Sequence, residues 1–169
     1  MATAAAALER ITTQYIDSQD RVRLAGVSGN AAPVVIWLTQ RLLQRLLPVL
    51  FQWLQRQDNT LPLADVFHGF AQQAAQAELT PQAPVQAEAA SRAWLALSVD
   101  ISCSNESVGL IFRGADGESA TLTLATKPLR QWLGILHEAY RQAQWPLQGW
   151  PEWLQANEDP MQQRPALLH

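Results

Sequence analysis

Two internal histidines, one cysteine and four aspartates are the side chains whose types could support catalysis or metal binding. Cys103 is the only cysteine, and it would act as a nucleophile only beside a base such as His68 or His137. The aspartates stand near the ends of expected strands, where paired carboxylates could bind a divalent cation or catalyse hydrolysis: Asp17, Asp20, Asp100 and Asp116. Aspartate is also an ordinary turn residue, and single histidines and a lone thiol are commonly packing groups. We therefore expect no catalytic site, no metal site and no bound cofactor.

Sequence motifs for nucleotide binding and hydrolysis do not support an enzyme either. Gly26-Val27-Ser28-Gly29 has neither the spacing nor the lysine of a phosphate-binding loop. His137 and Glu138 are adjacent on an expected helix, so their side chains point about 100° apart and cannot easily share a metal ion. The sequence therefore favours a non-catalytic protein.

A group of arginines forms the first candidate binding surface. Arg41, Arg45 and Arg56 fall on the polar side of an expected helix, and residues 33–57 contain no acidic residue. Such a face is typical of proteins that contact phosphates or nucleic acid. The alternative is the solvated side of an amphipathic helix, which the overall net charge of −3 favours.

The seven tryptophans supply the second candidate surface. Most are expected in the core, since each indole buries about 150–250 Å². A group beyond the last expected helix is too apolar for a free segment: Trp145, Trp150, Trp153 and Leu154. Either this segment folds back onto the domain, or it docks on another chain, because tryptophan is enriched at interface hot spots.

The elements that would position these residues occur in a repeated order. Residues 22–57 and 108–144 each read as strand, turn, strand, threonine and helix, displaced by about 87 positions. Thr39 and Thr126 stand where each apolar run becomes helical, and each is expected to cap its helix. Pro48 lies inside the first of these helices and predicts a kink. The correspondence suggests an internal duplication.

The predicted fold is α+β, with two pseudo-repeated antiparallel β-β-β-α units and helices on one face or end of the sheets. A helix over 63–79 is expected to form a helical hairpin with the helix before it. Its apolar face is Leu63, Val66, Phe67, Phe70, Ala71 and Ala74. Residues 80–91 read as a linker between halves 8–57 and 94–144. The domain is expected to cover residues 1–154, with 155–169 as a flexible tail.

This order of elements is similar to that of the head domains of eukaryotic end-joining scaffolds and of the centriolar cartwheel protein. The resemblance implies a non-enzymatic protein that dimerises. Trp145-Pro146 ends the last helix, so no long coiled-coil stalk follows, which departs from those families.

Three functions therefore stay open. The first is an interaction or scaffold protein that forms a homodimer or docks a protein partner through an apolar helix or the Trp-rich tail. The second is a nucleic-acid-associated module that uses the arginine face. The third is a small-ligand or enzymatic pocket between the two halves.

No membrane-spanning or export segment is expected. Met1–Ala7 has no basic residue before its alanines, as a signal peptide would have. The most hydrophobic window, 33–54, is interrupted by Arg41 and Arg45, whereas a bilayer span needs ~20 predominantly apolar residues. We expect a cytoplasmic protein.

Overall fold

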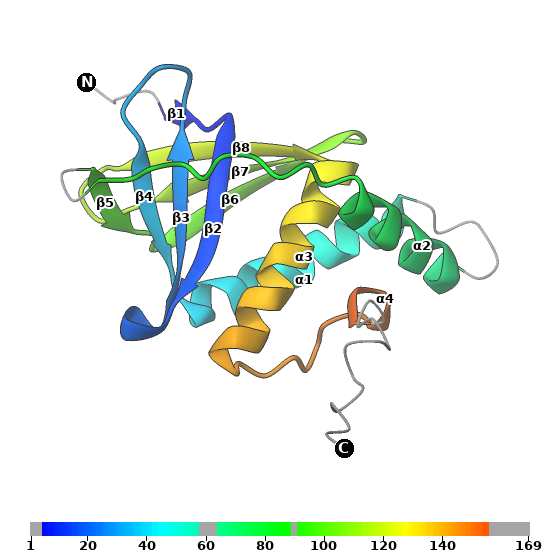
Figure 1. Cartoon of the computed structure of the whole chain (residues 1–169). Coiled ribbons are helices and arrows are strands. Elements are labelled where there is room, and N and C mark those ends of the chain that lie inside the picture. Colours follow the sequence, from blue (N-terminus) through cyan, green and yellow to red (C-terminus); the bar gives the residue numbers. More distant parts are fainter. Residues whose placement is uncertain (1–4, 58–63, 89–90, 156–169) are drawn as a thin grey trace.

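The computed structural model describes residues 5–57, 64–88 and 91–155. Its strands form two four-stranded sheets, and its helices lie together on one side of them (Figure 1). The helices are α1 (Gln40–Arg56), α2 (Ala64–Ala77), α3 (Thr126–Ala143) and α4 (Glu152–Gln155), with a 3-10 turn at Asp17–Gln19. The predicted α+β class is confirmed. Beyond Gln155, the predicted tail lies outside the described residues.

The two sheets have the strand orders β1-β8-β7-β6 and β2-β3-β4-β5. The strands are β1 (Ala6–Ala7), β2 (Arg10–Ile16), β3 (Arg21–Val27), β4 (Val34–Leu38), β5 (Arg92–Leu95), β6 (Ser98–Cys103), β7 (Ser107–Arg113) and β8 (Ser119–Ala125). Each sheet contains a three-stranded antiparallel meander and one added parallel strand. The added strand comes from the other half of the chain, since β1 pairs with β8 and β5 pairs with β4.

Two segments of the chain pass directly from one sheet into the other. The Leu8 amide donates to the Thr121 carbonyl at 2.8 Å in one sheet, and the next amide donates to the Val27 carbonyl at 2.9 Å in the other. The same change of sheet occurs at residues 96 and 97. The Ala96 amide donates to the Trp37 carbonyl in one sheet, and the Leu97 amide donates to the Arg113 carbonyl in the other. The segment from Arg92 to Cys103 therefore forms two strands, β5 and β6, because the chain changes sheets between them.

The first hairpins of the two halves have the same register at the predicted offset. Ile16 pairs with Arg21 in β2–β3, and Cys103 pairs with Val108 in β6–β7. The third strands do not correspond in this way, because β4 and β8 are shifted along their neighbours relative to each other. Duplication of the chain stays a prediction, which superposition of the two halves would test.

The two long helices begin differently. Thr39 is the N-cap of α1, as predicted, and its hydroxyl accepts a hydrogen bond from the Leu42 amide at 3.2 Å. The corresponding prediction for Thr126 was wrong: this residue is the first of α3, and Ala125 is an N-cap without a side-chain hydrogen bond. The reason is that β8 continues to Ala125 and leaves no loop before the helix. α1 continues through Pro48, and the expected kink stays a prediction.

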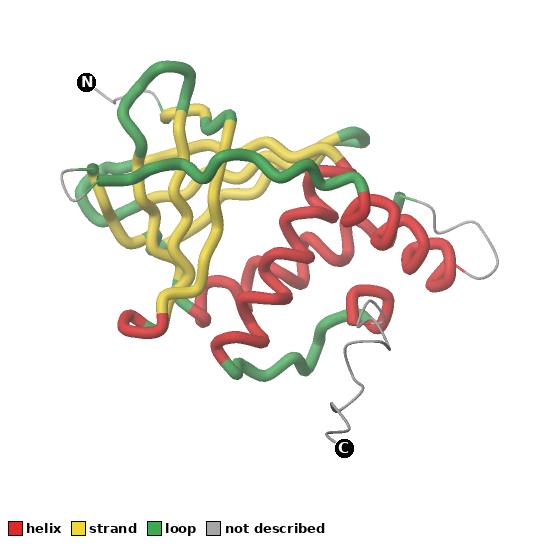
Figure 2. The backbone as a smooth tube through the Cα atoms, in the orientation of Figure 1, coloured by secondary structure: helices red, strands yellow, loops and turns green. Residues whose placement is uncertain are grey.

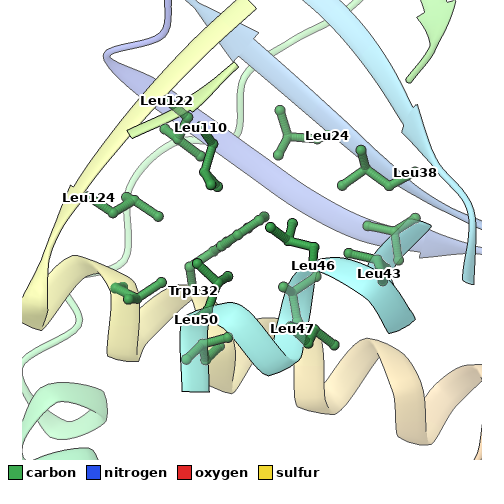
Figure 3. Packing of buried hydrophobic residues seen from close by; sticks show 14 of the residues in the cluster. Leu24, Leu38, Leu43, Leu46, Leu47, Leu50, Leu110, Leu122, Leu124 and Trp132 are labelled. Carbon is green, nitrogen blue, oxygen red and sulfur yellow. The ribbon is translucent and has the colours of Figure 1, made fainter. Parts of the chain in front are cut away.

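A single large apolar cluster joins both sheets to α1 and α3. Alternation along β3 directs Val22 and Leu24 inward, while Arg21 and Arg23 on the other face stay partly exposed. Leucines from both sheets and from α1 meet Trp132 of α3 in this core (Figure 3). The labelled residues are Leu24, Leu38, Leu43, Leu46, Leu47, Leu50, Leu110, Leu122, Leu124 and Trp132.

The predicted linker packs on the domain as a strap across the outer face of the β2-β3-β4-β5 sheet (Figure 2). Val85 is buried against Ala25 and Val35. Its amide donates to the Thr12 hydroxyl at 2.8 Å. A buried apolar side chain and a satisfied amide hold this part of the strap to the sheet, which a free linker would not show.

Helix α2 packs against α3 and α4, rather than against α1 as a helical hairpin would require. The apolar stripe of α3 is already committed to the core, so α2 contacts the neighbouring side of α3. Among the described residues, no helix has the length and apolar character that crossing a bilayer requires.

Candidate interaction surfaces

The side chains considered for catalysis lie in different surroundings. Cys103 is exposed at the end of β6, whereas His68 and His137 are buried among the helices. Within the part of the chain that the structure describes, no three histidine, cysteine or acidic side chains are placed to hold a metal ion together.

The four aspartates have structural partners or positions in turns. Asp20 accepts hydrogen bonds from the Tyr15 hydroxyl at 2.8 Å and from the Trp145 indole at 3.1 Å. Asp100 forms an ion pair with Arg113 on the neighbouring strand. Asp116 lies in the β7–β8 turn, where its amide donates to a Glu118 carboxylate oxygen. Asp17 begins the 3-10 turn.

A polar cluster that the sequence did not reveal is buried where α2, α3 and α4 meet. Arg130 is 3% exposed, and its Nη2 lies 2.8 Å from His68 Nδ1. A guanidinium can only donate, so Nδ1 accepts and the imidazole is neutral with its proton on Nε2. Gln72 donates to the Arg130 carbonyl at 2.8 Å, and the guanidinium lies 5.3 Å from the centre of the Trp153 ring. This cluster holds the three helices together.

The Trp-rich tail folds back onto its own chain. Trp145, Trp150, Trp153 and Leu154 are all at most 7% exposed. Gln144 ends α3 in a left-handed conformation, and Gly149 at φ 91° turns the chain again, which brings Trp150 onto α1. There its ring lies 5.0 Å from that of Phe51. The partner-surface prediction for these four side chains was therefore wrong, and the fold-back alternative holds.

The predicted arginine face is present on the solvent side of α1. Arg41, Arg45 and Arg56 are all exposed, and helical geometry places them within about 60° of one another around the axis. In the described residues, the ion pairs involve Arg113, Lys127 and Arg141, and none involves these three arginines.

Helix α2 buries its polar side and exposes its apolar side. Its polar residues His68 and Gln72 are buried, while Val66 is 51% exposed, Phe67 41% and Phe70 68%. Ala74 and Ala77 continue this exposed surface toward the end of the helix. We call these five residues the α2 apolar face. The sequence predicted that most of these residues form one apolar face of a helix in a helical hairpin. In the structure this face points to solvent.

The hollows among the described residues include the following two. The larger is a groove of about 470 Å³ between β2 and α3. Its lining residues are Thr13, Gln14, Tyr15, Ile135, Glu138, Ala139 and Gln142. The smaller, about 190 Å³, lies where the two halves meet and is lined by residues that include Arg92, Trp94 and Glu118.

Comparison with known proteins adds no assignment. The chain matches no family, no curated protein and no solved structure.

Proposed function

We propose that this chain is a non-catalytic interaction protein that self-associates through the α2 apolar face. The observation that carries the proposal is the orientation of α2, which buries His68 and Gln72 and exposes Phe67 and Phe70. A contiguous exposed apolar surface commonly marks a site of protein contact.

A second copy of the chain matches this face in charge and in the positions of its large and small side chains. Residues 66–77 contain no charged side chain, so two such faces meet without repulsion between like charges. In a two-fold interface, when residue i of one copy contacts residue j of the other, residue j of the first copy also contacts residue i of the second. Phe67 and Phe70 lie in the first half of α2, and Ala74 and Ala77 lie in the second half. Antiparallel pairing therefore places the rings of each copy against the alanines of the other.

The expected dimer is weak. Helix α2 has 14 residues and is about 21 Å long, so one helix pair buries less than the ~1,600 Å² of a standard interface. We expect dissociation constants in the micromolar range.

Sedimentation velocity from about 1 µM to about 300 µM tests the proposal. The wild-type chain should shift from monomer to dimer, and Phe70→Glu should remain monomeric because it places a charge in the contact. Leu97→Glu is the matched control, since Leu97 is 58% exposed between β5 and β6 and outside this face. A monomeric wild-type chain at the highest concentration contradicts self-association, as does a Phe70→Glu variant that dimerises normally.

The arginine face supports a second candidate function, which is binding to nucleic acid. Three exposed arginines on one side of α1 provide positive charge for contacts with phosphates, although the net charge of the chain is −3. Fluorescence anisotropy with a single-stranded and a duplex oligonucleotide across a salt series tests this function. Affinity should fall steeply with salt, because each phosphate contact releases counterions.

Changing Arg41, Arg45 and Arg56 together to glutamine should reduce the salt slope. Arg10→Gln with Arg92→Gln should leave that slope unchanged, since both residues lie away from α1. Absence of binding at low ionic strength contradicts this second function.

A further inference from the structure

The groove between β2 and α3 combines an open strand edge with a helical wall. β2 is an edge strand, and in the described part of the chain β3 is the only strand that pairs with it from Arg10 to Ile16. Figure 1 shows β2 as the strand of its sheet nearest to α3, and the two elements are in contact. An edge strand presents a row of outward amides and carbonyls that can pair with another extended chain.

The helical wall is one face of α3. Ile135, Glu138, Ala139 and Gln142 follow the spacing of a single helix face and line the groove opposite β2. Ala139 is buried, whereas Ile135 is partly exposed and Glu138 and Gln142 are exposed. The volume of about 470 Å³ lies within the range of ~300–1,000 Å³ that is usual for ligand sites.

Hydrogen bonds fix both ends of this groove. At one end the Trp132 indole donates to the Thr13 hydroxyl at 3.1 Å and ties α3 to β2. At the other end Tyr15 donates to Asp20, which also accepts from Trp145. The strand and the helix are thus held in place, and ligand binding would require little ordering of this region.

We infer that this groove binds an extended peptide segment of a partner protein by strand addition to β2, and that the segment carries a basic residue. Main-chain hydrogen bonds to the strand edge provide affinity in this mode, and side-chain contacts provide selectivity. Glu138 is the only charged side chain among the residues that line the groove. It is 56% exposed and forms a long, solvent-exposed ion pair with Arg141 at 3.5 Å, which a basic residue of a peptide can replace or join. A lysine or arginine of the peptide complements its charge, and small apolar residues fit against Ile135 and Ala139.

This inference does not depend on self-association, because the α2 apolar face and the groove share no residue. Binding is tested with the full chain and the fluorescein-labelled hexapeptide Thr-Val-Lys-Val-Thr-Val. Two probes serve for comparison: one with glutamate in place of lysine, and one with alternate backbone amides methylated. The lysine probe should bind about threefold to tenfold more tightly than the glutamate probe, as expected for an exposed charge pair. Methylation should abolish binding, because it removes the amides that pair with β2.

The variant Glu138→Lys should reverse the preference between the two charged probes. Glu106→Lys is the matched control, since Glu106 is exposed in the β6–β7 turn outside the groove. Gln142→Lys adds a positive charge to the same wall and should weaken binding of the lysine probe by a similar factor. The inference is overturned by equal affinity for both charged probes, by unchanged binding after methylation, or by no binding of the lysine probe at about 1 mM.

Discussion

The buried phenol of Tyr140 makes stability dependent on pH in the alkaline range. Tyr140 is 2% exposed, and its ring packs edge-on against Trp145 and Trp150 at centroid distances of 5.0 and 5.1 Å. Its hydroxyl has no hydrogen-bond partner among the described residues. Burial raises the pKa of Tyr140 to about 12 from the ordinary value of 10.0.

The direction of the effect follows from proton binding in the two states. Above pH 10 the unfolded chain loses the Tyr140 proton, whereas the folded chain keeps it until its higher pKa is reached. The unfolded state then binds fewer protons, so the free energy of unfolding falls as pH rises. The contribution is fully present below pH 10 and is lost by about pH 12. Each pKa unit corresponds to about 1.4 kcal/mol, which gives an upper bound of about 3 kcal/mol.

Urea denaturation of the wild-type chain and Tyr140→Phe at several values between pH 7 and pH 12 measures this contribution. The variant should lack this component of the alkaline loss. At neutral pH it should be as stable as wild type, or more stable by about 1 kcal/mol, because it removes a buried hydroxyl without a partner.

Tyrosinate absorbance provides a direct readout, since the chain has only two tyrosines. The other is Tyr15, whose hydrogen bond to Asp20 raises its pKa to about 12. Tyr15→Phe therefore isolates the titration of Tyr140. Parallel loss of stability in wild type and Tyr140→Phe, or ionisation of Tyr140 near pH 10 in the folded chain, would refute the reasoning.

Three further predictions concern capping, the folded tail and the thiol. Thr39→Ala should lose about 1 kcal/mol of stability, because it removes the hydroxyl that caps α1, while Thr126→Ala should change stability much less. Chemical denaturation of both variants measures the difference, and equal losses would contradict the assignment of the caps. Trp153→Ala should cost about 3–5 kcal/mol, because it opens a cavity beside Arg130 and His68. A calorimetric loss below about 1 kcal/mol would show that this indole is not packed. Cys103 should react with Ellman's reagent in the folded chain nearly as fast as in urea, since it is exposed, and strong protection would place it elsewhere.

Local sequence patterns predicted the elements that depend on local interactions. Thr39 could be identified as a cap because the capping bond joins it to a residue three positions away. The strands and the helices on either side of Thr39 and Thr126 follow from residue alternation and helical period in the same way. The class of the fold follows from the order of these elements.

The sequence pattern could not predict features that depend on distant partners. Nothing local marks Leu8 or Leu97 as the place where a strand changes sheets, since the two acceptors are Thr121 and Arg113. The orientation of α2 depends on Arg130, which binds His68 from another helix. Alternation and helical period record burial by close neighbours, whereas these contacts join residues far apart in the chain.

The exchange of strands between the sheets determines when each sheet can be completed during synthesis. β4 has no partner on its outer edge until β5 leaves the ribosome, and β1 must wait for β8, whose Ala120 pairs with Ala6. Pairings between such distant residues form slowly, because long loops must close first. A nascent chain that ends before residue 92 therefore exposes the edge of β4, which is a template for aggregation. Folding of this protein is a property of the whole chain, and the first half alone does not contain a finished sheet.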